Sequence, residues 1–320
     1  MAKYTENHSL RSIITFSVLC ALCAAGVVTS TVLAVQNSRL KAQITRLIER
    51  RESYAETLDE PEEPSREEPH LGNYPMIDGA ALNMYDMSLL RTDKRGRVAL
   101  YSEEGEKLSR LGVDVSSHQG KIDWQAVAED GVEFAFIRAG FRGYETGRIA
   151  EDSRFVENAE GAAAAGLDIG LYFYSQALNE QEAREEAQFL IDSLERINAR
   201  VTLPLVFDWE LPEGENVRTE DLSGAEQTRC CEAFCAAVRE AGYEAAYYAS
   251  VNTAIFRYDL SALHDESLWL AQYTDEPDFP YRHDIWQFTC FGQVNGIDTY
   301  TDMNIMYTHT KEDTDGTDEA

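Results

Sequence analysis

Basic residues and cysteines are scarce in this chain of 320 residues. Lysine and arginine number 28 against 57 aspartates and glutamates, which gives a formal charge of −29. A protein that binds a polyphosphate needs basic patches, so this balance argues against nucleic acid as a partner. Two of the six cysteines, Cys20 and Cys23, lie in an apolar stretch near the N-terminus, and the other four form no CxxC or zinc-ligand pattern, which argues against a metal site. For Cys230, Cys231, Cys235 and Cys290 we expect buried thiols, with a disulfide to Cys290 as the alternative in an oxidising compartment.

Charged residues are absent from one long stretch near the N-terminus, Ser12 to Gln36. As a helix with a rise of ~1.5 Å per residue it is ~37 Å long, enough to cross a hydrocarbon core of ~30 Å. We therefore expect a transmembrane signal anchor over residues 12–36, preceded by a short cytoplasmic tail over residues 1–11. The alternative is a secretory signal cleaved after Val32-Leu33-Ala34. Either interpretation exports the rest of the chain.

Acidic, proline-rich sequence follows the apolar stretch. Residues 37–75 are typical of a juxtamembrane helix and then an extended spacer, because the prolines stand among glutamates that repel one another. Residues 76–110 form a small lead-in segment, in which residues 98–105 are typical of a strand and a turn. The tail over residues 309–320 is acidic and nearly free of apolar side chains, so we expect it to be disordered.

Short apolar runs alternate with helical patterns between residues 111 and 308. Alternating strands and helices over ~200 residues indicate an α/β fold with a parallel sheet, and eight strands suggest a closed barrel. The later connections are too short for full helices, so we predict a TIM-like β/α barrel with an incomplete helical ring. The predicted strands are residues 111–115, 134–139, 169–174, 203–207, 245–249, 268–273, 285–288 and 304–307, and the predicted helices are residues 124–128, 154–165, 180–197 and 225–241.

Two carboxylates separated by one aromatic residue, Asp208 and Glu210, follow the fourth apolar run. Residues two apart in a strand face the same side, and the carboxyl ends of barrel strands form the face that holds active sites. Taken alone, such a pair more often caps the next helix. Here, however, Asp114 lies in the first strand and Asp302 lies just before the eighth. Acids, aromatics and amides on one face suit a cleft that binds sugars.

The motifs at these strand ends resemble those of glycoside hydrolase family 25, the lysozymes that act as N-acetylmuramidases on peptidoglycan. The motifs are GVDVSSHQGKIDW at residues 112–124, VFDWE at 206–210, WLAQY at 269–273, WQ at 286–287 and VNGIDTYTDMN at 294–304. Tyr300 and Thr301 depart from the closing motif of the family, and Phe288 replaces the commoner tyrosine. Asp302 and Asn304 of that motif are kept.

The resemblance implies that Glu210 is the general acid that protonates the glycosidic oxygen, and that Asp208, Asp114 and Asp302 complete a cluster of four carboxylates. Cleaving an acetal needs one protonated carboxyl group beside ionised ones, and crowded acids produce that split because like charges raise one pKa above the others. No cofactor or metal ion is expected. The side chains expected to contact the substrate are Tyr172, Tyr174, Tyr248, Gln272, Trp286 and Gln287.

Several alternatives stay open on the sequence alone. The spacing of Asp208 and Glu210 fits retention or inversion, and substrate-assisted retention is the first hypothesis because muramic acid carries a 2-acetamido group. A non-catalytic wall-binding or scaffold protein and an N-acetylglucosaminidase are the competing functions, although four intact carboxylates favour an enzyme. We interpret Ser116, Ser117 and His118 as polar packing at a strand end rather than as a nucleophile and its base.

The resemblance also bears on how the predicted span is oriented. Five basic residues between positions 39 and 51 would place the C-terminal side in the cytoplasm by the positive-inside rule. Because the implied substrate lies outside the cell, we expect the opposite: a single-pass protein of the cell membrane whose catalytic domain is extracellular and faces the wall. Its partners would be peptidoglycan glycan strands and, through the N-terminal helix, the lipid bilayer; secretion after signal cleavage is the alternative. Nothing in the sequence indicates an oligomeric state.

Overall fold

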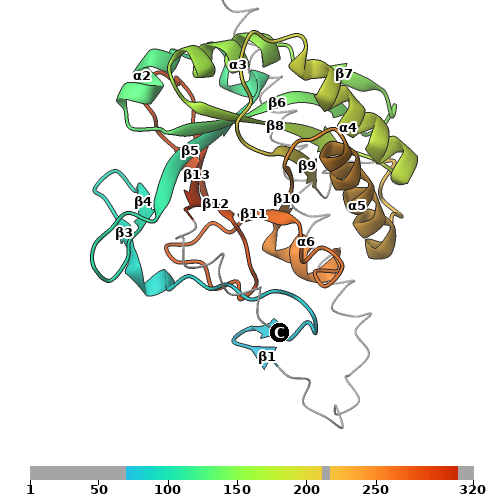
Figure 1. The fold of residues 1–320 in the computed structure, drawn as a ribbon, viewed down its shortest axis with the longest axis horizontal. Helices are drawn as coiled ribbons and strands as arrows, with labels where there is room; N and C mark the ends of the chain where they lie inside the picture. Colours follow the sequence, from blue (N-terminus) through green and yellow to red (C-terminus); the bar gives the residue numbers. More distant parts are fainter. Residues whose placement is uncertain (1–69, 211–216, 309–320) are drawn as a thin grey trace, which may run out of the picture. The chain divides into compact units, whose positions relative to one another are not determined.

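Eight strands close into a barrel in the computed structural model, which describes residues 70–210 and 217–308 (Figure 1). The strands are β5 (Ser109–Val115), β6 (Phe134–Arg142), β8 (Asp168–Ser175), β9 (Leu205–Trp209), β10 (Ala245–Ser250), β11 (Ser267–Ala271), β12 (Ile285–Gly292) and β13 (Thr301–Tyr307). Each pairs with the next, and β5 pairs with both β6 and β13, which closes the ring. A short strand, β7 (Ile149–Glu151), extends the sheet beside β6. All eight predicted strands are confirmed, with ends that differ by a few residues.

The last strand of the barrel runs in the opposite direction from the others. The other seven barrel strands are parallel to their neighbours among themselves, whereas β13 is antiparallel to both β12 and β5. The prediction of a parallel sheet is therefore wrong for this strand. The reason is the connection over residues 293–300, which contains no helix, because a parallel connection needs a crossover of a dozen or more residues. As a result, the N-terminal end of β13 lies at the carboxyl ends of the other strands.

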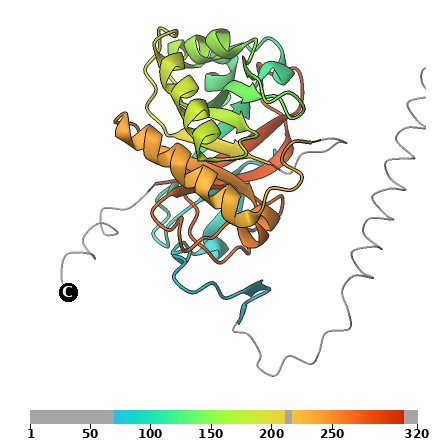
Figure 2. The ribbon, with the colours of Figure 1, turned by 90° about the vertical axis from the view of Figure 1, so that its right-hand side faces the viewer.

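Helices cover only part of the barrel, as predicted. They are α2 (Trp124–Glu129), α3 (Phe155–Ala164), α4 (Glu180–Leu194), α5 (Gly224–Glu240) and α6 (Val251–Phe256), and Figure 2 shows α4 and α5 side by side on the outside of the sheet. A capping box between Ser223 and Glu226 starts α5. Its buried face packs on the barrel, with the ring centroids of Phe234 and Phe207 5.2 Å apart. In the described part of the chain, no helix follows β11 or β12.

The lead-in segment covers the side of the barrel that lacks helices (Figure 1). It begins at residue 70 rather than 76, because the end of the predicted spacer forms the paired strands β1 (His70–Leu71) and β2 (Tyr74–Pro75). The 3-10 helix η1 (Met87–Leu89), β3 (Leu90–Thr92) and β4 (Val98–Leu100) follow. Leu82 forms a β-bridge with Tyr281, and the rings of Tyr85 and Tyr307 lie 4.4 Å apart. Residues 70–108 therefore belong to the same packed body as the barrel, and the strand predicted near residue 98 is present as β4.

The interior of the barrel is filled by aromatic side chains below the carboxyl ends of the strands. Phe136 stacks on Trp269 with centroids 4.8 Å apart, and Tyr172 and Tyr248 contact the same indole edge-on. Gly112 makes room for this packing, since a Cβ there would come within 2.3 Å of the ring of Phe134. This layer excludes water and forms a rigid floor for whatever lies above it.

The cysteines of the described residues are free thiols. Cys230, Cys231 and Cys235 are buried in α5, as expected, and Cys290 is half-buried in β12. Burial raises the pKa of the Cys231 thiol well above its ordinary value, so this thiol is held in its unreactive form.

Other predicted segments lie outside the described residues. They are the cytoplasmic tail, the transmembrane helix, the spacer up to residue 69 and the acidic tail over residues 309–320. Among the helices that the structure does describe, none has the length and apolarity needed to cross a bilayer.

Candidate active site

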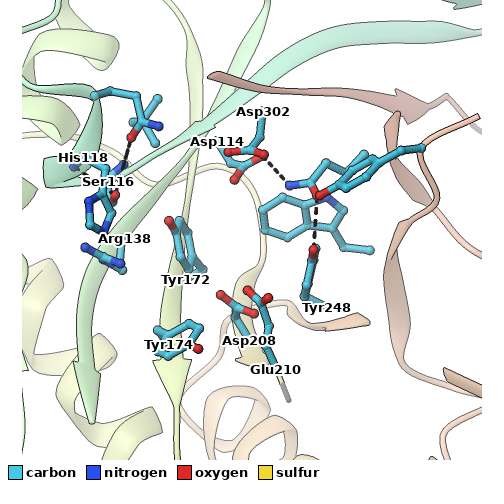
Figure 3. A pocket seen from close by; sticks show the side chains of 15 residues that line it. Asp114, Ser116, His118, Arg138, Tyr172, Tyr174, Asp208, Glu210, Tyr248 and Asp302 are labelled. Carbon is cyan, nitrogen blue, oxygen red and sulfur yellow. Dashed lines mark hydrogen bonds between the residues drawn. The ribbon is translucent and has the colours of Figure 1, made fainter. Parts of the chain in front are cut away.

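A pocket of about 250 Å³ opens at the carboxyl ends of the parallel strands (Figure 3). Of the ten side chains predicted to form the site, eight line this pocket: Asp114, Tyr172, Tyr174, Asp208, Glu210, Tyr248, Gln287 and Asp302. The remaining lining residues were not predicted: Val115, Ser116, His118, Gln119, Arg138, Trp269 and Tyr273. The structure therefore brings all four predicted carboxyl groups together, from β5, β9 and β13.

Two predicted substrate contacts, Trp286 and Gln272, do not line the pocket. Trp286 is fully buried, and its Nε1 donates a hydrogen bond of 2.8 Å to the backbone oxygen of Gln272. The alternation of a strand explains this, because Gln287 faces the barrel interior and its neighbour must face outward. The amide of Gln272 instead contacts Asp278 and the hydroxyl of Tyr74 in the lead-in segment.

Asp114 is buried at the end of β5 and is held by two amides. Its Oδ2 accepts hydrogen bonds from Gln287 Nε2 at 2.9 Å and from Asn304 Nδ2 at 2.8 Å. Burial raises the pKa of Asp114 well above its ordinary value, the charge of Asp302 raises it further, and the two amide hydrogen bonds oppose this rise. Asp114 therefore holds a proton far more tightly than an exposed aspartate does.

Asp302 lies beside Asp114 because β13 is antiparallel to β5. The two residues are direct partners in the register of these strands. Burial raises the pKa of Asp302 from 3.8 to about 6. A wholly parallel barrel would have placed the start of the last strand, and this carboxyl group with it, at the opposite end of the molecule.

Asp208 and Glu210 form the second carboxyl pair, at the end of β9. Figure 3 shows the two carboxyl groups side by side and directed toward Asp114 and Asp302. Asp208 is buried, and its Oδ1 has no hydrogen-bond partner among the described residues. Burial raises the pKa of Asp208 well above its ordinary value, and the charge of Glu210 adds to the rise. Glu210, one residue beyond the strand, is exposed.

Gln287 connects the carboxyl pairs to the aromatic wall. Its Oε1 accepts hydrogen bonds from the hydroxyl groups of Tyr273 at 2.7 Å and Tyr248 at 3.1 Å, which fixes the orientation of the amide. The Nε2 group is thereby directed at Asp114. Trp269 is held in the same way, since its Nε1 donates to Asn304 Oδ1 at 2.8 Å. The polar atoms of this wall are satisfied, and its ring faces line the pocket.

Arg138 is the cationic residue of the pocket that sequence reasoning missed. Its guanidinium pairs with the fully buried carboxylate of Asp152 at 2.7 Å. Asp152 also accepts hydrogen bonds of 3.0 Å from the backbone N–H groups of Ser117 and Arg154. The positive charge of Arg138 opposes the rise in the pKa of Asp208. A charged residue inside the apolar run of β6 was the available signal, because such a residue needs a buried partner.

Ser116 and His118 lie on the pocket wall, but their contacts are those of a helix cap. The side chain of Ser116 accepts a hydrogen bond of 3.2 Å from the backbone N–H of His118, at the start of the 3-10 helix η2 (Ser117–Gln119). Gln119 completes the capping box through the backbone N–H of Ser116 at 2.8 Å. This contact agrees with the interpretation of Ser116 as strand-end packing.

The family model described as glycosyl hydrolases family 25 matches residues 113–297, which is more than half of the chain. The chain belongs to this family. The predicted resemblance is confirmed, and the family 25 match includes Asp114, Asp208 and Glu210, whereas Asp302 lies just beyond it.

Two curated lysozymes are similar in sequence. The autolytic lysozyme of Clostridium acetobutylicum is 27% identical over 195 residues, which are 60% of this chain and 54% of that protein. Lysozyme M1 of Streptomyces globisporus is 37% identical over 65 residues, 20% of each chain. The chain therefore spans little more than half of the first relative and a fifth of the second.

Solved structures of other proteins have a fold similar to that of this chain. The modular autolysin LytC from Streptococcus pneumoniae, solved with a synthetic peptidoglycan ligand, has a TM-score of 0.57 at 22% identity, covering 68% of this chain and 52% of that one. The spore cortex lytic enzyme SleM from Clostridium perfringens has a TM-score of 0.53 at 21% identity, covering 64% and 69%. At these identities the similarity establishes the fold alone.

Proposed function

We propose that this protein is a 1,4-β-N-acetylmuramidase, a lysozyme that hydrolyses the bond between N-acetylmuramic acid and N-acetylglucosamine in peptidoglycan. The observation that carries the proposal is the convergence of two carboxyl pairs, Asp208 with Glu210 and Asp114 with Asp302, on one aromatic-walled pocket of a family 25 barrel. The lysozyme and autolysin names of the relatives support the same substrate.

Glu210 is the proposed general acid. It is the exposed member of the cluster and the longer side chain of its pair, so it reaches a glycosidic oxygen that enters the pocket from outside. Its proton passes to that oxygen while the bond between the oxygen and the anomeric carbon breaks and the electron pair stays with the leaving sugar. Glu210 then removes a proton from the water that completes hydrolysis.

The neighbouring acids stabilise the charge that develops in this step and help the pair to keep its proton. Positive charge develops on the sugar ring as the bond breaks, and Asp208 lies beside Glu210 to stabilise it. Since the charge of Glu210 raises the pKa of Asp208, two ionised carboxylates side by side are unfavourable and the pair retains a proton to higher pH. This shared proton is the one that a general acid requires. Asp114 and Asp302 form a second carboxyl pair, toward which the first pair is directed. The pKa values of both are raised as well.

We propose a retaining course assisted by the substrate. The acetamido oxygen of muramic acid attacks the anomeric carbon as the leaving group departs, and Asp208 orients the amide and holds the charge of the resulting oxazolinium ion. NMR spectroscopy of the first product tests this: retention gives the β-anomer first, and early accumulation of the α-anomer would refute it.

The decisive experiment identifies the new reducing end. Purified full-length protein is incubated with peptidoglycan, and the digest is reduced with borohydride before hydrolysis and sugar analysis. A muramidase gives muramitol. Glucosaminitol would instead identify an N-acetylglucosaminidase, and wall binding without any new reducing end would identify a non-catalytic binding protein.

Substitution of the acid tests the assigned roles. Glu210→Gln keeps the size of the side chain and removes the donated proton, so we expect kcat to fall about 10²- to 10⁴-fold while the protein still binds peptidoglycan. Glu240→Gln, at the far end of α5, is the matched control and keeps full activity. Wild-type turnover by Glu210→Gln would overturn the assignment.

We also propose that the protein acts from the membrane, with the catalytic domain outside the cell. Support comes from the charge-free stretch over residues 12–36 and from the location of the substrate. Fractionation of cells tests this, because a signal anchor keeps the full-length chain in the membrane fraction. A mature protein in the culture supernatant with its N-terminus near Ala34 would overturn it.

A further inference from the structure

Two large aromatic side chains are exposed together where β12 ends and β13 begins. Phe291 is 71% exposed and Tyr300 is 58% exposed. Their rings are in edge-to-face contact, with centroids 5.8 Å apart and planes at 84°. Each ring buries part of its apolar surface against the other, and the rest is exposed to water. A contacting pair of this kind on a chain with a net charge of −29 marks a binding surface more often than a lone exposed ring does.

The pair stands next to the carboxyl cluster. Tyr300 is two residues from Asp302, and continuing the alternation of β13 places Tyr300 on the side of the strand that carries Asp302 into the pocket. Thr301, between them, donates a hydrogen bond of 3.3 Å to the backbone oxygen of Asp114. On the partner strand β12, Gly292 pairs with Thr301 in the antiparallel register, so Phe291 and Tyr300 flank the same pair of residues.

The backbone that carries the pair is held in place on both strands. The N–H of Phe291 donates to Thr289 Oγ1 at 3.1 Å, and Gly292 has no room for a side chain, since a Cβ would lie 2.3 Å from Met303. The tip of the connection is tied to α2, because the N–H of Asp123 donates to the oxygen of Gly296 at 2.9 Å. The aromatic pair is therefore preorganised rather than mobile.

We propose that Phe291 and Tyr300 form an aromatic platform that binds a second sugar ring of the glycan strand, next to the ring held at the carboxyl cluster. This inference rests on the proposed function, because its occupant is the polymer that enters the pocket. A pyranose presents an apolar face of C–H bonds that stacks on an aromatic ring while its hydroxyl groups stay in water. A sugar unit is neutral on that face, so the acidic surroundings do not repel it.

The test compares long and short substrates. The double variant Phe291→Ala/Tyr300→Ala loses both rings, whereas Tyr243→Ala removes an exposed tyrosine from the turn before β10, at the opposite end of the barrel. For each variant, kcat/KM on long glycan strands is divided by kcat/KM on a short substrate of one disaccharide unit. We expect this ratio to fall about five- to tenfold in the double variant and to stay at the wild-type value in Tyr243→Ala. The loss should appear in KM. An unchanged ratio in the double variant overturns the platform.

A binding measurement separates this inference from the proposed function. In the Glu210→Gln background, sedimentation with purified glycan strands reports affinity without hydrolysis. We expect the two alanine substitutions to weaken retention about tenfold and Phe291→Trp/Tyr300→Trp to restore it. Equal retention by the parent and the alanine variant refutes the platform. A wild-type protein that releases no reducing ends refutes the muramidase proposal instead, and the sedimentation result still decides the platform.

Discussion

Asp302 lies directly opposite Asp114 in the antiparallel pairing of β13 with β5. Two carboxyl groups at one register position, with Asp114 buried, are costly to ionise together. Burial raises the pKa of both. The fold tolerates this cost at a place where it has no packing benefit. Such destabilising clusters are characteristic of functional sites.

The first prediction concerns the stability of Asp302→Asn. Below the ordinary pKa of 3.8, Asp302 is protonated in the folded and unfolded states, so the substitution brings no gain. As the pH rises toward the folded pKa of about 6, the unfolded chain ionises and the folded chain resists, so the wild type loses stability. At 1.36 kcal/mol per pKa unit the loss is roughly 3 kcal/mol, complete above pH 6. We expect Asp302→Asn to be more stable than the wild type at pH 7 and inactive.

Urea denaturation at pH 4 and at pH 7 measures this difference. Exposed Asp275→Asn, in the loop after β11, is the control and should follow the wild type at both pH values. A difference between Asp302→Asn and the wild type that is the same at the two pH values would contradict the electrostatic account.

The second prediction concerns the amide of Gln287. Gln287→Leu removes one of two hydrogen bonds that oppose the rise in the pKa of Asp114, and it leaves the hydroxyl groups of Tyr248 and Tyr273 without their acceptor. Hydrogen bonds to charged groups are worth ~1.5–3 kcal/mol, so kcat/KM should fall about 10- to 100-fold. Tyr248→Phe keeps the bond from Gln287 to Asp114 and should cost far less. Equal losses in steady-state assays of the two variants would show that the amide has no special role.

The third prediction concerns Arg138. Its charge opposes the rise in the pKa of Asp208, so Arg138→Met raises that pKa further and Asp208 ionises only at higher pH. We expect the acidic limb of the profile of kcat against pH to move to higher pH by roughly one unit, the size of shift that one nearby charge produces. Arg138→Lys keeps the charge and should keep the profile.

Stability must be followed in parallel, because Arg138→Met leaves the buried carboxylate of Asp152 without its cation, which costs about 3–5 kcal/mol. The profile is therefore recorded at a temperature at which circular dichroism shows the variant to be folded. An unshifted limb in a folded Arg138→Met protein would mean that the arginine is structural only.

Much of the site was predictable because its signals are local. Buried strands are continuous apolar runs, so their order and number could be predicted, and Asp208 and Glu210 share a face by the two-residue alternation of a strand. Applying the same alternation to Trp286 and Gln287 would have excluded the tryptophan from the pocket.

The features that the sequence did not reveal depend on partners that no local pattern marks. Arg138 is held by Asp152, across the β6–β7 hairpin, and nothing near Arg138 in the sequence marks that pair. The position of Gln272 depends on Tyr74, almost two hundred residues earlier, in a segment with no regular pattern.

The last prediction concerns that lead-in segment, which takes the place of the missing helices. The hydroxyl of Tyr281 accepts from the N–H of Ile77 at 2.7 Å and donates to the oxygen of Pro75 at 2.5 Å, and Tyr85 covers Tyr307. Without residues 1–108, the side of the barrel around Tyr281 and Tyr307 would be exposed to water. Burial of one such side chain contributes ~1.5–3 kcal/mol, and each 1 kcal/mol shifts Tm by about 2–4 °C in a domain of this size.

A chain that begins at residue 70 should therefore have the Tm of the full-length protein. A chain that begins at residue 109 should have a Tm at least 10 °C lower, by the same conversion of about 2–4 °C per kcal/mol, or should fail to fold. Tyr85→Ala in the full-length chain keeps the test informative if the shorter chain is insoluble, since it removes one ring from the same contact and should lower Tm by several degrees. Thermal unfolding followed by circular dichroism measures all three. If the barrel alone and Tyr85→Ala melted with the wild type, the lead-in segment would be a tether lying on a surface that is already complete.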